Sequence, residues 1–351
     1  MGNYNTMTIG CDLGDRSTNL CMLNQQAKVV ERRKIATSKL GFQKVFAKRK
    51  RALVVVEAGT HSPWVSALLE KTGHEVIVAN PRNVRLISKN NSKSDRIDAE
   101  LLARLGRADR KLLAPVKHRS EQAQRDLAIV RARACLLESR TKLINHVRGS
   151  VKSFGERLYK CTADSFAQTA KFSLPEELRL ALSPVLESIE QLTVQLKAID
   201  KRLEKELPER IPEMTALRQV DGVGTLTALT FILTLDDPNR FKKSRKAGAY
   251  VGLRPGRSQT GKKDPELRIT KAGDRYLRSL LVNCAQYILG PFGKDSDLRH
   301  WGLKLAARGK KNAKKRAVVA TARKLAVLLH RLWVTGEVYQ PLGYEEQRIV
   351  A

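Results

Sequence analysis

The stretch LVVVE, residues 53–57, is a nearly continuous apolar run that ends in a carboxylate. Such a run is typical of a central strand that is buried on both faces of a sheet. Two further strands are expected beside it, at residues 7–14 and 76–81, and residues 19–24 are the expected hairpin partner of the first. Together these runs predict a sheet in the first third of the chain.

Helical spacing alternates with these strands. Residues 64–70 repeat their apolar positions with helical spacing, and a second helix is expected from Asp95 onward. Strands that alternate with helices are typical of an α/β unit, to which we assign residues 1–111.

The remainder of the chain predicts helices. Residues 112–210 are polar and low in glycine, and apolar stripes at 127–144 and 186–203 indicate a helical hairpin or coiled-coil arm. An oligomerisation arm and a helical spacer both explain this pattern. Residues 211–342 are basic and largely helical, and 343–351 form a tail. The expected fold class is α/β plus all-α.

The charge of the chain indicates its partners. The 351 residues include 66 Lys and Arg against 35 Asp and Glu, which gives a formal net charge of +31. A protein this basic repels itself unless it meets a polyanion, so nucleic acid is the first candidate and an anionic membrane surface the second. No apolar run approaches the ~18 residues of a membrane span, and no signal peptide is visible. We expect a cytoplasmic protein without a membrane partner.

The cysteines argue against two small-domain classes. The five are odd in number and scattered, and none forms a CxxC pair. A disulfide scaffold and a zinc finger are therefore not expected, and the pattern suits a reducing cytoplasm.

Four acidic residues of the first region stand out: Asp12, Glu57, Asp95 and Asp98. Asp12 lies on the first strand, Glu57 closes the apolar run, and the other two sit three apart at a helix start, so they face the same way. Gathered carboxylates are costly unless cations neutralise them, and such oxygen-rich sites suit Mg²⁺ or Mn²⁺. A pair of these ions about 4 Å apart supports phosphodiester chemistry.

Simpler explanations exist for three of these acids. Asp12 also fits a strand-end turn, Asp95 a helix N-cap, and Asp98 a first-turn residue favoured by the helix dipole. Glu57 is harder to explain, because strand propensity gives no reason for a glutamate at the end of an apolar run.

A second candidate site lies in the loop YVGLRPGRSQTGKK, residues 250–263. Thr260 precedes a glycine among several cations, which would lower the pKa of a hydroxyl nucleophile that attacks phosphorus. By composition alone, a phosphate-binding loop explains this segment better than a covalent catalyst does.

The nucleic-acid-binding candidates lie in the third region. Gly222 and Gly224 precede an apolar helix, so backbone amides there are placed to face an anion, as in a helix-hairpin-helix contact; a plain glycine-rich turn explains them almost as well. Lys271, Arg275 and Arg278 are placed to meet phosphates. The further charged candidates are Arg254, Arg257, Lys262, Lys310, Lys311, Lys314, Lys315 and Arg316. The run 310–316 fits a solvated or backbone-binding face better than a specific reader. Aromatic residues make up only 5% of the chain, so stacking on single strands is not its main theme.

These motifs together resemble one family, the DEDD-type transposases of bacterial insertion sequences known as the IS110 ("one-ten") family. The N-terminal motifs read GCDLG at 10–14, VVEAGT at 55–60 and KSDRIDA at 93–99. The C-terminal motifs read GVG at 222–224, AYVGLRP at 249–255 and TKAGDRYLR at 270–278. They follow the family's order and spacing over nearly the whole chain.

The resemblance implies more than the residues alone. It implies a RuvC-like, ribonuclease H-type first domain in which Asp12, Glu57, Asp95 and Asp98 bind two Mg²⁺ ions. It also implies a helical arm, a C-terminal transposase domain with a hydroxyl nucleophile, and a composite site across the subunits of a dimer or tetramer. A structured non-coding RNA of the element would guide the enzyme to donor and target DNA at the bacterial nucleoid.

One position departs from the family pattern. The family usually has serine directly before the glycine of the third-region loop, whereas this chain has Thr260 before Gly261 and Ser258 two residues earlier. Threonine is a competent but more crowded nucleophile. We therefore predict Thr260 as the nucleophile, with Ser258 as the alternative.

Three functions follow from these observations. The first is a metal-dependent transposase or recombinase that breaks and rejoins DNA strands. The second is a junction-resolving nuclease that uses only the acidic residues and water. The third is a non-catalytic nucleic-acid-binding protein in which the acids are structural.

Overall fold

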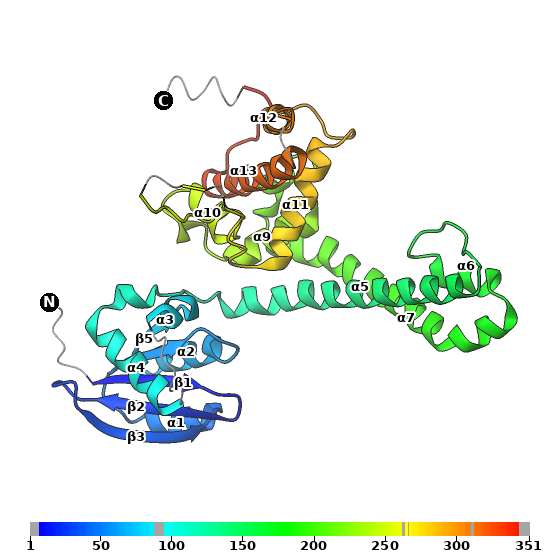
Figure 1. Ribbon diagram of the computed structural model, residues 1–351. Helices are drawn as coiled ribbons and strands as arrows, with labels where there is room; N and C mark the ends of the chain where they lie inside the picture. The colour runs from blue at the N-terminus through cyan, green and yellow to red at the C-terminus, as the bar shows by residue number, and fades with distance from the viewer. Residues whose placement is uncertain (1–6, 88–94, 262–263, 266, 310–311, 344–351) are drawn as a thin grey trace. The chain divides into compact units, whose positions relative to one another are not determined.

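The computed structural model describes residues 7–87, 95–261, 264–265, 267–309 and 312–343, and it leaves the side chains of residues 85–87, 95 and 96 undescribed. The chain divides into two units, residues 1–118 and 119–351 (Figure 1).

A mixed five-stranded sheet forms the centre of the first unit. Its strands are β1 (Thr8–Leu13), β2 (Ser17–Leu23), β3 (Val29–Ala36), β4 (Leu53–Glu57) and β5 (Glu75–Ala79). Their order is β3-β2-β1-β4-β5; β1, β2 and β3 are antiparallel neighbours, while β4 runs parallel to both β1 and β5. The strand predicted from LVVVE is therefore an interior strand of the sheet, as its apolar run requires.

Helices cover both faces of this sheet. They are α1 (Lys39–Phe46), α2 (Ser62–Lys71), α3 (Pro81–Ile87), α4 (Asp95–Ala108) and the 3₁₀ turn η1 (Arg110–Leu113). Phe42 of α1 and Leu69 of α2 pack on the face that carries Ile9 and Val54. The opposite face, which carries Val55, packs against α4 and η1.

The predicted elements of this unit are confirmed, and two more were missed. Residues 7–14, 19–24, 53–57, 64–70 and 76–81 all contain the expected strand or helix. The edge strand β3 and helix α1 gave no clear signal. Most side chains of β3 are exposed, so it lacks the apolar alternation that marks a half-buried strand.

Among its described residues, the regular structure of the second unit consists of helices and one isolated antiparallel β-bridge between Pro255 and Ile269. Its elements are α5 (Glu121–Ser153), α6 (Phe166–Ser173), α7 (Glu176–Arg210), α8 (Met214–Arg218), α9 (Thr225–Leu235), η2 (Pro238–Arg240), α10 (Arg245–Tyr250), α11 (Arg275–Leu289), α12 (Asp297–Ala306) and α13 (Ala313–Thr335). Helices α9, α11 and α13 share one apolar core. The N-terminal part of α5 and the C-terminal part of α7 add to this core Leu127, Val130, Leu203 and Leu207.

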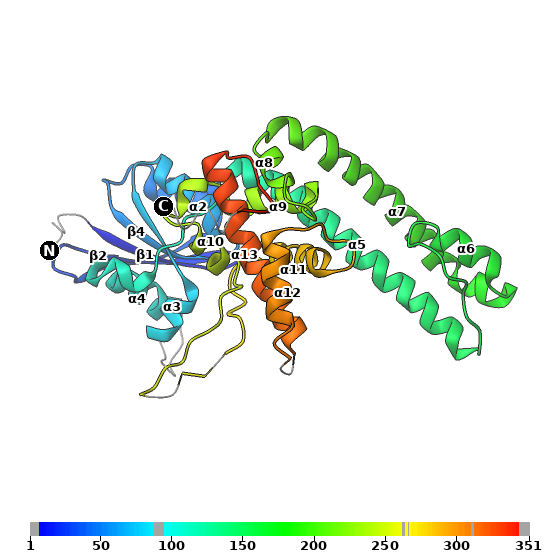
Figure 2. The same ribbon diagram turned by 90° about the horizontal axis from the view of Figure 1, so that it is seen from above.

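Beyond this core, α5 and α7 lie side by side and carry α6 at their far end (Figures 1 and 2). A separate apolar cluster there joins all three helices, with Phe166 of α6 at its centre. Most of the residues predicted as apolar stripes are buried between the helices; Cys135 is an exception and is exposed.

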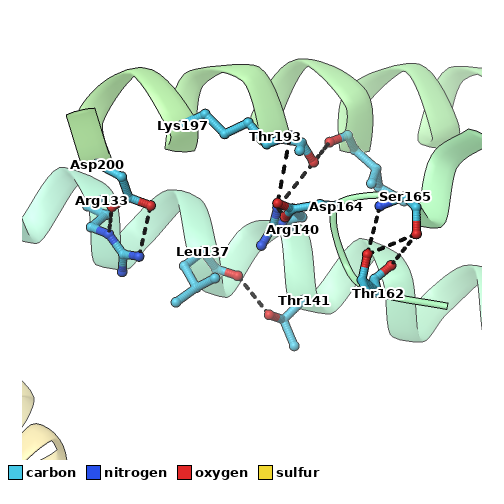
Figure 3. A network of polar contacts seen from close by, with 11 residues as sticks. Arg133, Leu137, Arg140, Thr141, Thr162, Asp164, Ser165, Thr193, Lys197 and Asp200 are labelled. Carbon is cyan, nitrogen blue, oxygen red and sulfur yellow. Dashed lines mark hydrogen bonds and ion pairs between the residues drawn. The ribbon is translucent and has the colours of Figure 1, made fainter.

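Polar contacts also join α5 to α7, as Figure 3 shows. The guanidinium group of Arg133 donates to Asp200, at 3.1 Å for Nη2 and Oδ2. The buried Arg140 donates from Nη1 to Asp164 at 2.8 Å and to Thr193 Oγ1 at 3.2 Å. Such paired polar groups in an otherwise apolar seam favour one register of the two helices over others.

Two expectations about the chain class can be compared with the structure. All five cysteines are free thiols, in agreement with the prediction that no disulfide scaffold is present. Within the residues described above, no helix is both long and apolar enough to cross a membrane.

Candidate active site

Strand register places Asp12 next to Glu57. Cys11 of β1 is paired with Val56 of β4 in the parallel ladder, so the next residue of each strand lies at the same end of the sheet. Cys11 and Val56 belong to the core beneath α1 and α2. Because strand side chains alternate between faces, the half-buried Asp12 and Glu57 belong to the face covered by α4.

A glycine brings helix α4 onto the same strand. A Cβ on Gly10 would lie within 3.0 Å of both the Ala99 carbonyl oxygen and the Ala103 amide nitrogen, so only glycine allows this approach. Asp98 immediately precedes Ala99 in the helix. The first turns of α4 therefore lie close to β1, the strand that carries Asp12.

The direction of α4 is set by its last turn. Arg107 Nη1 donates to the carbonyl of Asn24, in the β2–β3 hairpin, at 3.3 Å. That hairpin lies near the start of β1, since Leu23 pairs with Thr8. The helix thus runs antiparallel to β1, and its acidic N-terminus lies toward the strand end that carries Asp12 and Glu57.

We call Asp12, Glu57 and Asp98, together with the backbone position of Asp95, the acidic edge. The Asp95 side chain lies outside the described residues. Among the side chains that are described, no group of three or more His, Cys, Asp or Glu has metal-ligand spacing. The fold brings the three segments that carry these acids, β1, β4 and the start of α4, to one edge. The closing of their oxygens around metal stays a prediction.

The electrostatics of the edge are visible in a neighbouring thiol. Burial, with a smaller contribution from the Asp12 carboxylate, strongly raises the pKa of Cys11. On the far side of α4, hydrogen bonds from Arg104 and Arg32 lower the pKa of Glu100. Glu100 is therefore ionised and ties the helix to β3, which supports the position of Asp98 two residues earlier.

The sequence analysis missed an acid–imidazole pair close to this edge in the chain. His61 Nε2 lies 3.5 Å from Asp15 Oδ1, and His61 Nδ1 accepts a hydrogen bond from Trp64 Nε1 at 3.1 Å. Asp15 follows Asp12 by three residues and His61 follows Glu57 by four. Asp15 and His61 each come a few residues after a candidate carboxylate, and this pattern in the sequence could have predicted the pair.

The second candidate site has a rigid base. A Cβ on Gly252 would lie within 3.0 Å of the Ala272 backbone, and one on Gly273 within 3.0 Å of the Tyr250 carbonyl oxygen. Both glycines have positive φ, of 76° and 73°. The motifs AYVGLRP and TKAGD therefore interlock through their backbones.

Arg278 reinforces this base from within. Its Nη1 donates to the carbonyls of Val251 and Ala272, each at 3.0 Å. We predicted Arg278 as a phosphate contact, and the structure shows it bound to the loop backbone. Its role toward nucleic acid stays a prediction.

From this base the chain extends as an open hairpin, residues 256–268, which we call the hydroxyl loop (Figure 2). Its stem is closed by the hydrogen bonds Gly256 N to Arg268 O and Thr270 N to Arg254 O, both 2.9 Å. Ser258 and Thr260 are exposed in the loop, and Arg257 Nη2 donates to Gln259 Oε1 at 2.6 Å. The predicted contact Lys262 lies outside the described residues.

The other predicted contacts are mostly exposed. Arg254, Lys271 and Arg275 are exposed near the base of the hydroxyl loop, and Lys271 has a positive φ of 53°. Lys314, Lys315 and Arg316, which we call the basic turn, form the first turn of α13 together with Ala313 and are exposed. Lys310 and Lys311 lie outside the described residues.

The basic turn has an unusual composition for a helix start. Positive charge at a helix N-terminus is unfavourable because the macrodipole is positive there, and the first turn of α13 holds no acid. The charges therefore do not serve the helix, which favours a role toward an external polyanion.

Gly222 and Gly224 begin α9 in different ways. Gly222 has a positive φ of 83°, and Gly224 is the N-cap of α9, without a side-chain cap. The Val223 amide of this turn donates to the Val220 carbonyl at 3.0 Å, and a contact of the turn with nucleic acid stays a prediction.

Comparison with known proteins gives a consistent picture. Residues 9–155 match the family described as DEDD_Tnp_IS110, Transposase, and residues 214–296 match the Transposase IS116/IS110/IS902 family. The chain is 30% identical over 339 residues to a Sinorhizobium fredii protein that bears the name of a transposase, y4pF/y4sB, across 95% of this chain and 85% of the relative. It is 28% identical over 348 residues to the transposase for insertion sequence element IS1111A of Coxiella burnetii, across 95% of this chain and 91% of the relative.

The acidic edge falls within the first matched segment and the hydroxyl loop within the second. Together with the fold, they define a transposase of an insertion sequence, a class of enzyme that binds, cuts and rejoins DNA. The chain belongs to the IS110 family of these transposases.

Proposed function

We propose that this transposase cuts and rejoins DNA by metal-assisted phosphoryl transfer to a hydroxyl nucleophile. The observation that carries the proposal is the acidic edge, where strand register and the Gly10 contact bring Asp12, Glu57 and the start of α4 together. The nucleophile is Thr260, with Ser258 as the alternative. A structured non-coding RNA guides the reaction, and the protein acts as a dimer or tetramer.

The first unit is proposed to be ribonuclease H-like and RuvC-like. The strand order β3-β2-β1-β4-β5, with an antiparallel first half and a parallel second half, supports this fold. Its candidate acids Asp12 and Glu57 lie at the carboxyl ends of the parallel strands β1 and β4, the usual place for ligands in open α/β sheets.

The residues of the acidic edge fit two Mg²⁺ or Mn²⁺ ions in their chemistry. All the donors are carboxylate oxygens, the ligands that these hard cations prefer. Asp12 and Glu57 are half-buried beside an apolar core, where neighbouring negative charges raise each other's energy without a counter-ion. When bound, such ions polarise the phosphate and stabilise the leaving oxygen.

The chain supplies the remaining steps. The hydroxyl oxygen of Thr260 attacks the phosphorus, an O–P bond to DNA forms, and the phosphodiester bond to the departing strand breaks. The hydroxyl proton passes to solvent water during the attack, and the departing oxygen takes up a proton from solvent. Nearby guanidinium groups such as that of Arg257 offset the charge that develops on the phosphate. Attack by another strand's hydroxyl end reverses the step and rejoins DNA.

The covalent intermediate gives the direct test. End-labelled DNA carrying the element junction is incubated with full-length protein, Mg²⁺ and RNA transcribed from the element's flank, and then denatured and separated. We expect a protein–DNA adduct that Thr260→Ala abolishes and Thr260→Ser retains. Ser279→Ala, an exposed hydroxyl on α11, is the matched control.

Other results would redirect the assignment. Loss of the adduct in Ser258→Ala alone would move the nucleophile to Ser258. Nicking without any adduct would favour the junction-resolving nuclease. Adduct formation that survives both Asp12→Asn and Glu57→Gln would contradict the role of the acidic edge, and omission of RNA tests the guide.

A further inference from the structure

The second unit contains a cavity that neither candidate site uses. It is a depression of about 490 Å³ that opens widely to solvent. It lies between the Gly222–Gly224 turn and helix α11, and its polar or aromatic lining residues are Arg218, Asp221, Thr227, Asn283, Cys284 and Tyr287.

Tyr287 forms a rigid aromatic wall of this cavity. A Cβ on Gly222 would lie 2.7 Å from Cδ1 of the tyrosine ring, so the ring packs against bare backbone. Tyr287 as a residue is nevertheless 42% exposed. One side of the aromatic group is thus held by the protein while part of its surface is open to a ligand.

The floor of the cavity is neutral. Thr227 and Cys284 are buried there, with Thr227 Oγ1 and Cys284 Sγ 3.4 Å apart. Burial raises the pKa of the Cys284 thiol, which keeps it uncharged. The Asp221 carboxylate accepts a hydrogen bond from the Lys294 backbone and lies 3.8 Å from Lys294 Nζ, so its charge is offset.

Two polar side chains at the rim remain available. Arg218 and Asn283 are exposed, and neither side chain makes a hydrogen bond or ion pair within the described part of the chain. The asparagine amide offers one acceptor and two donors, while the guanidinium offers a delocalised positive charge. The Tyr287 ring, the Asn283 amide and the Arg218 guanidinium suit the flat face, the hydrogen-bonding edge and the phosphate of a nucleotide.

We infer that this cavity binds one unpaired nucleotide of the nucleic acid that the transposase handles. The base stacks on Tyr287, its hydrogen-bonding edge meets Asn283, and the phosphate meets Arg218. A paired base does not fit, because both its faces are stacked within the duplex. A single such site agrees with the low aromatic content of the chain.

This inference rests on the nucleic-acid partner that the family implies and uses neither the metal site nor the nucleophile. Its test is therefore a binding measurement. If strand transfer fails, the binding result can still be interpreted, because it does not depend on catalysis.

The experiment compares single strands that differ only in their bases. Full-length protein is titrated with fluorescent oligonucleotides of about 12 nucleotides that carry either bases or abasic residues, in deoxy and ribo forms. Salt of about 0.3 M weakens backbone contacts and makes the base contribution visible. We expect Tyr287→Leu to weaken binding of the base-bearing strand about five- to a hundredfold and to leave the abasic strand unchanged. Tyr287→Phe should bind like the parent.

Two controls make the outcome decisive. Tyr159→Leu removes an aromatic residue that is 76% exposed on the arm, and it should change nothing. Thermal unfolding of each variant separates binding from loss of fold. A loss confined to deoxy or ribo strands identifies DNA or RNA as the source of the nucleotide. Equal weakening of base-bearing and abasic strands, or no weakening at all, would overturn the inference.

Discussion

The acidic edge and the hydroxyl loop are positioned by different means. Asp12 and Glu57 sit on two paired strands, and one glycine contact fixes the helix that carries Asp98. In the hydroxyl loop the base is fixed through Gly252 and Gly273, while Thr260 is exposed further out. The acidic edge is built on strands and a helix, whereas the hydroxyl loop extends from the interlocked backbones at Gly252 and Gly273, which we call the clamp.

This difference matches the chemistry proposed for each region. Carboxylates that hold ions need positions fixed to a fraction of an ångström, which strands and helices provide better than loops. A nucleophile must reach a strand that enters and leaves, and an exposed loop on a rigid base provides that reach. The comparison predicts that each region fails when its own glycine contact is lost.

The clamp of the hydroxyl loop should give the largest effect. Gly252→Ala forces a Cβ into the Ala272 backbone and places a side chain at φ 76°, so strain adds to overpacking. We expect unit 2 to lose about 2–5 kcal/mol of unfolding free energy, with loss of adduct formation. Calorimetry of the full-length protein measures the change.

The control for this clamp is Gly149→Ala. Gly149 lies inside α5, and a Cβ there meets no atom within 4 Å. Alanine should stabilise the helix by about 0.5–1 kcal/mol. Equal stability of the two variants would refute the interlocked base.

The acidic edge should respond next most strongly. Gly10→Ala would push α4 away from β1 at Ala99, and we expect a loss of about 1–3 kcal/mol in unit 1 together with loss of strand transfer. Gly59→Ala is the matched control, because a Cβ at that position also has open space. If Gly10→Ala keeps full activity, the helix does not need this approach to position Asp98.

Arg278 distinguishes a structural role from nucleic-acid binding. Arg278→Met removes the donor to the carbonyls of Val251 and Ala272, and we expect unit 2 to lose about 1–3 kcal/mol. Adduct formation should slow more than DNA affinity falls. A variant that unfolds like the parent but binds DNA with a smaller salt slope would instead support the phosphate contact.

A buried histidine makes the clamp region sensitive to pH. Burial lowers the pKa of His330, whose ring bonds Ser244 Oγ at 3.0 Å and the Pro238 carbonyl at 2.9 Å, just before α10. Below the ordinary value of 6.5 the unfolded chain gains a proton that the folded chain resists. Stability of unit 2 should therefore fall with decreasing pH, by at most about 1.4 kcal/mol per unit for this residue.

The variant His330→Gln isolates this effect from other titrations. Its amide can still bond both partners but carries no proton equilibrium in this range. Denaturation from pH 7.5 to pH 5 should show a shallower decline than in the parent. Parallel curves would exclude His330 as the source.

Sequence patterns predicted the elements whose residues contact the core in a regular repeat. The apolar run 53–57, the strand before Asp12 and the helix from Asp95 all carry such local signals, and the segments of the acidic edge followed from them. The edge strand β3 and helix α1 were missed, because an exposed strand needs no alternation and a short helix gives few repeats.

Contacts between distant backbones left no comparable signal. The residues around Gly252 do not indicate that its backbone contacts Ala272. The pattern around Arg278 predicted a phosphate contact, whereas its guanidinium group binds two backbone carbonyls. The pair Asp15 and His61 is different, because its spacing beyond Asp12 and Glu57 was a signal in the sequence that the prediction did not use.

The smallest effect is expected at the basic turn, which differs in charge from the acidic edge. Replacing Lys314 and Lys315 by Gln removes two exposed cations from the first turn of α13. If both contact phosphates, the slope of log affinity against log salt should fall by up to about 1.8 on duplex DNA, and affinity should drop severalfold at moderate salt. Stability should change in the opposite direction, because removing positive charge from a helix N-terminus relieves an unfavourable interaction with the macrodipole. Weaker binding together with an unchanged or higher melting temperature would therefore indicate that the basic turn binds a polyanion. An unchanged salt slope would show that the basic turn does not contact DNA.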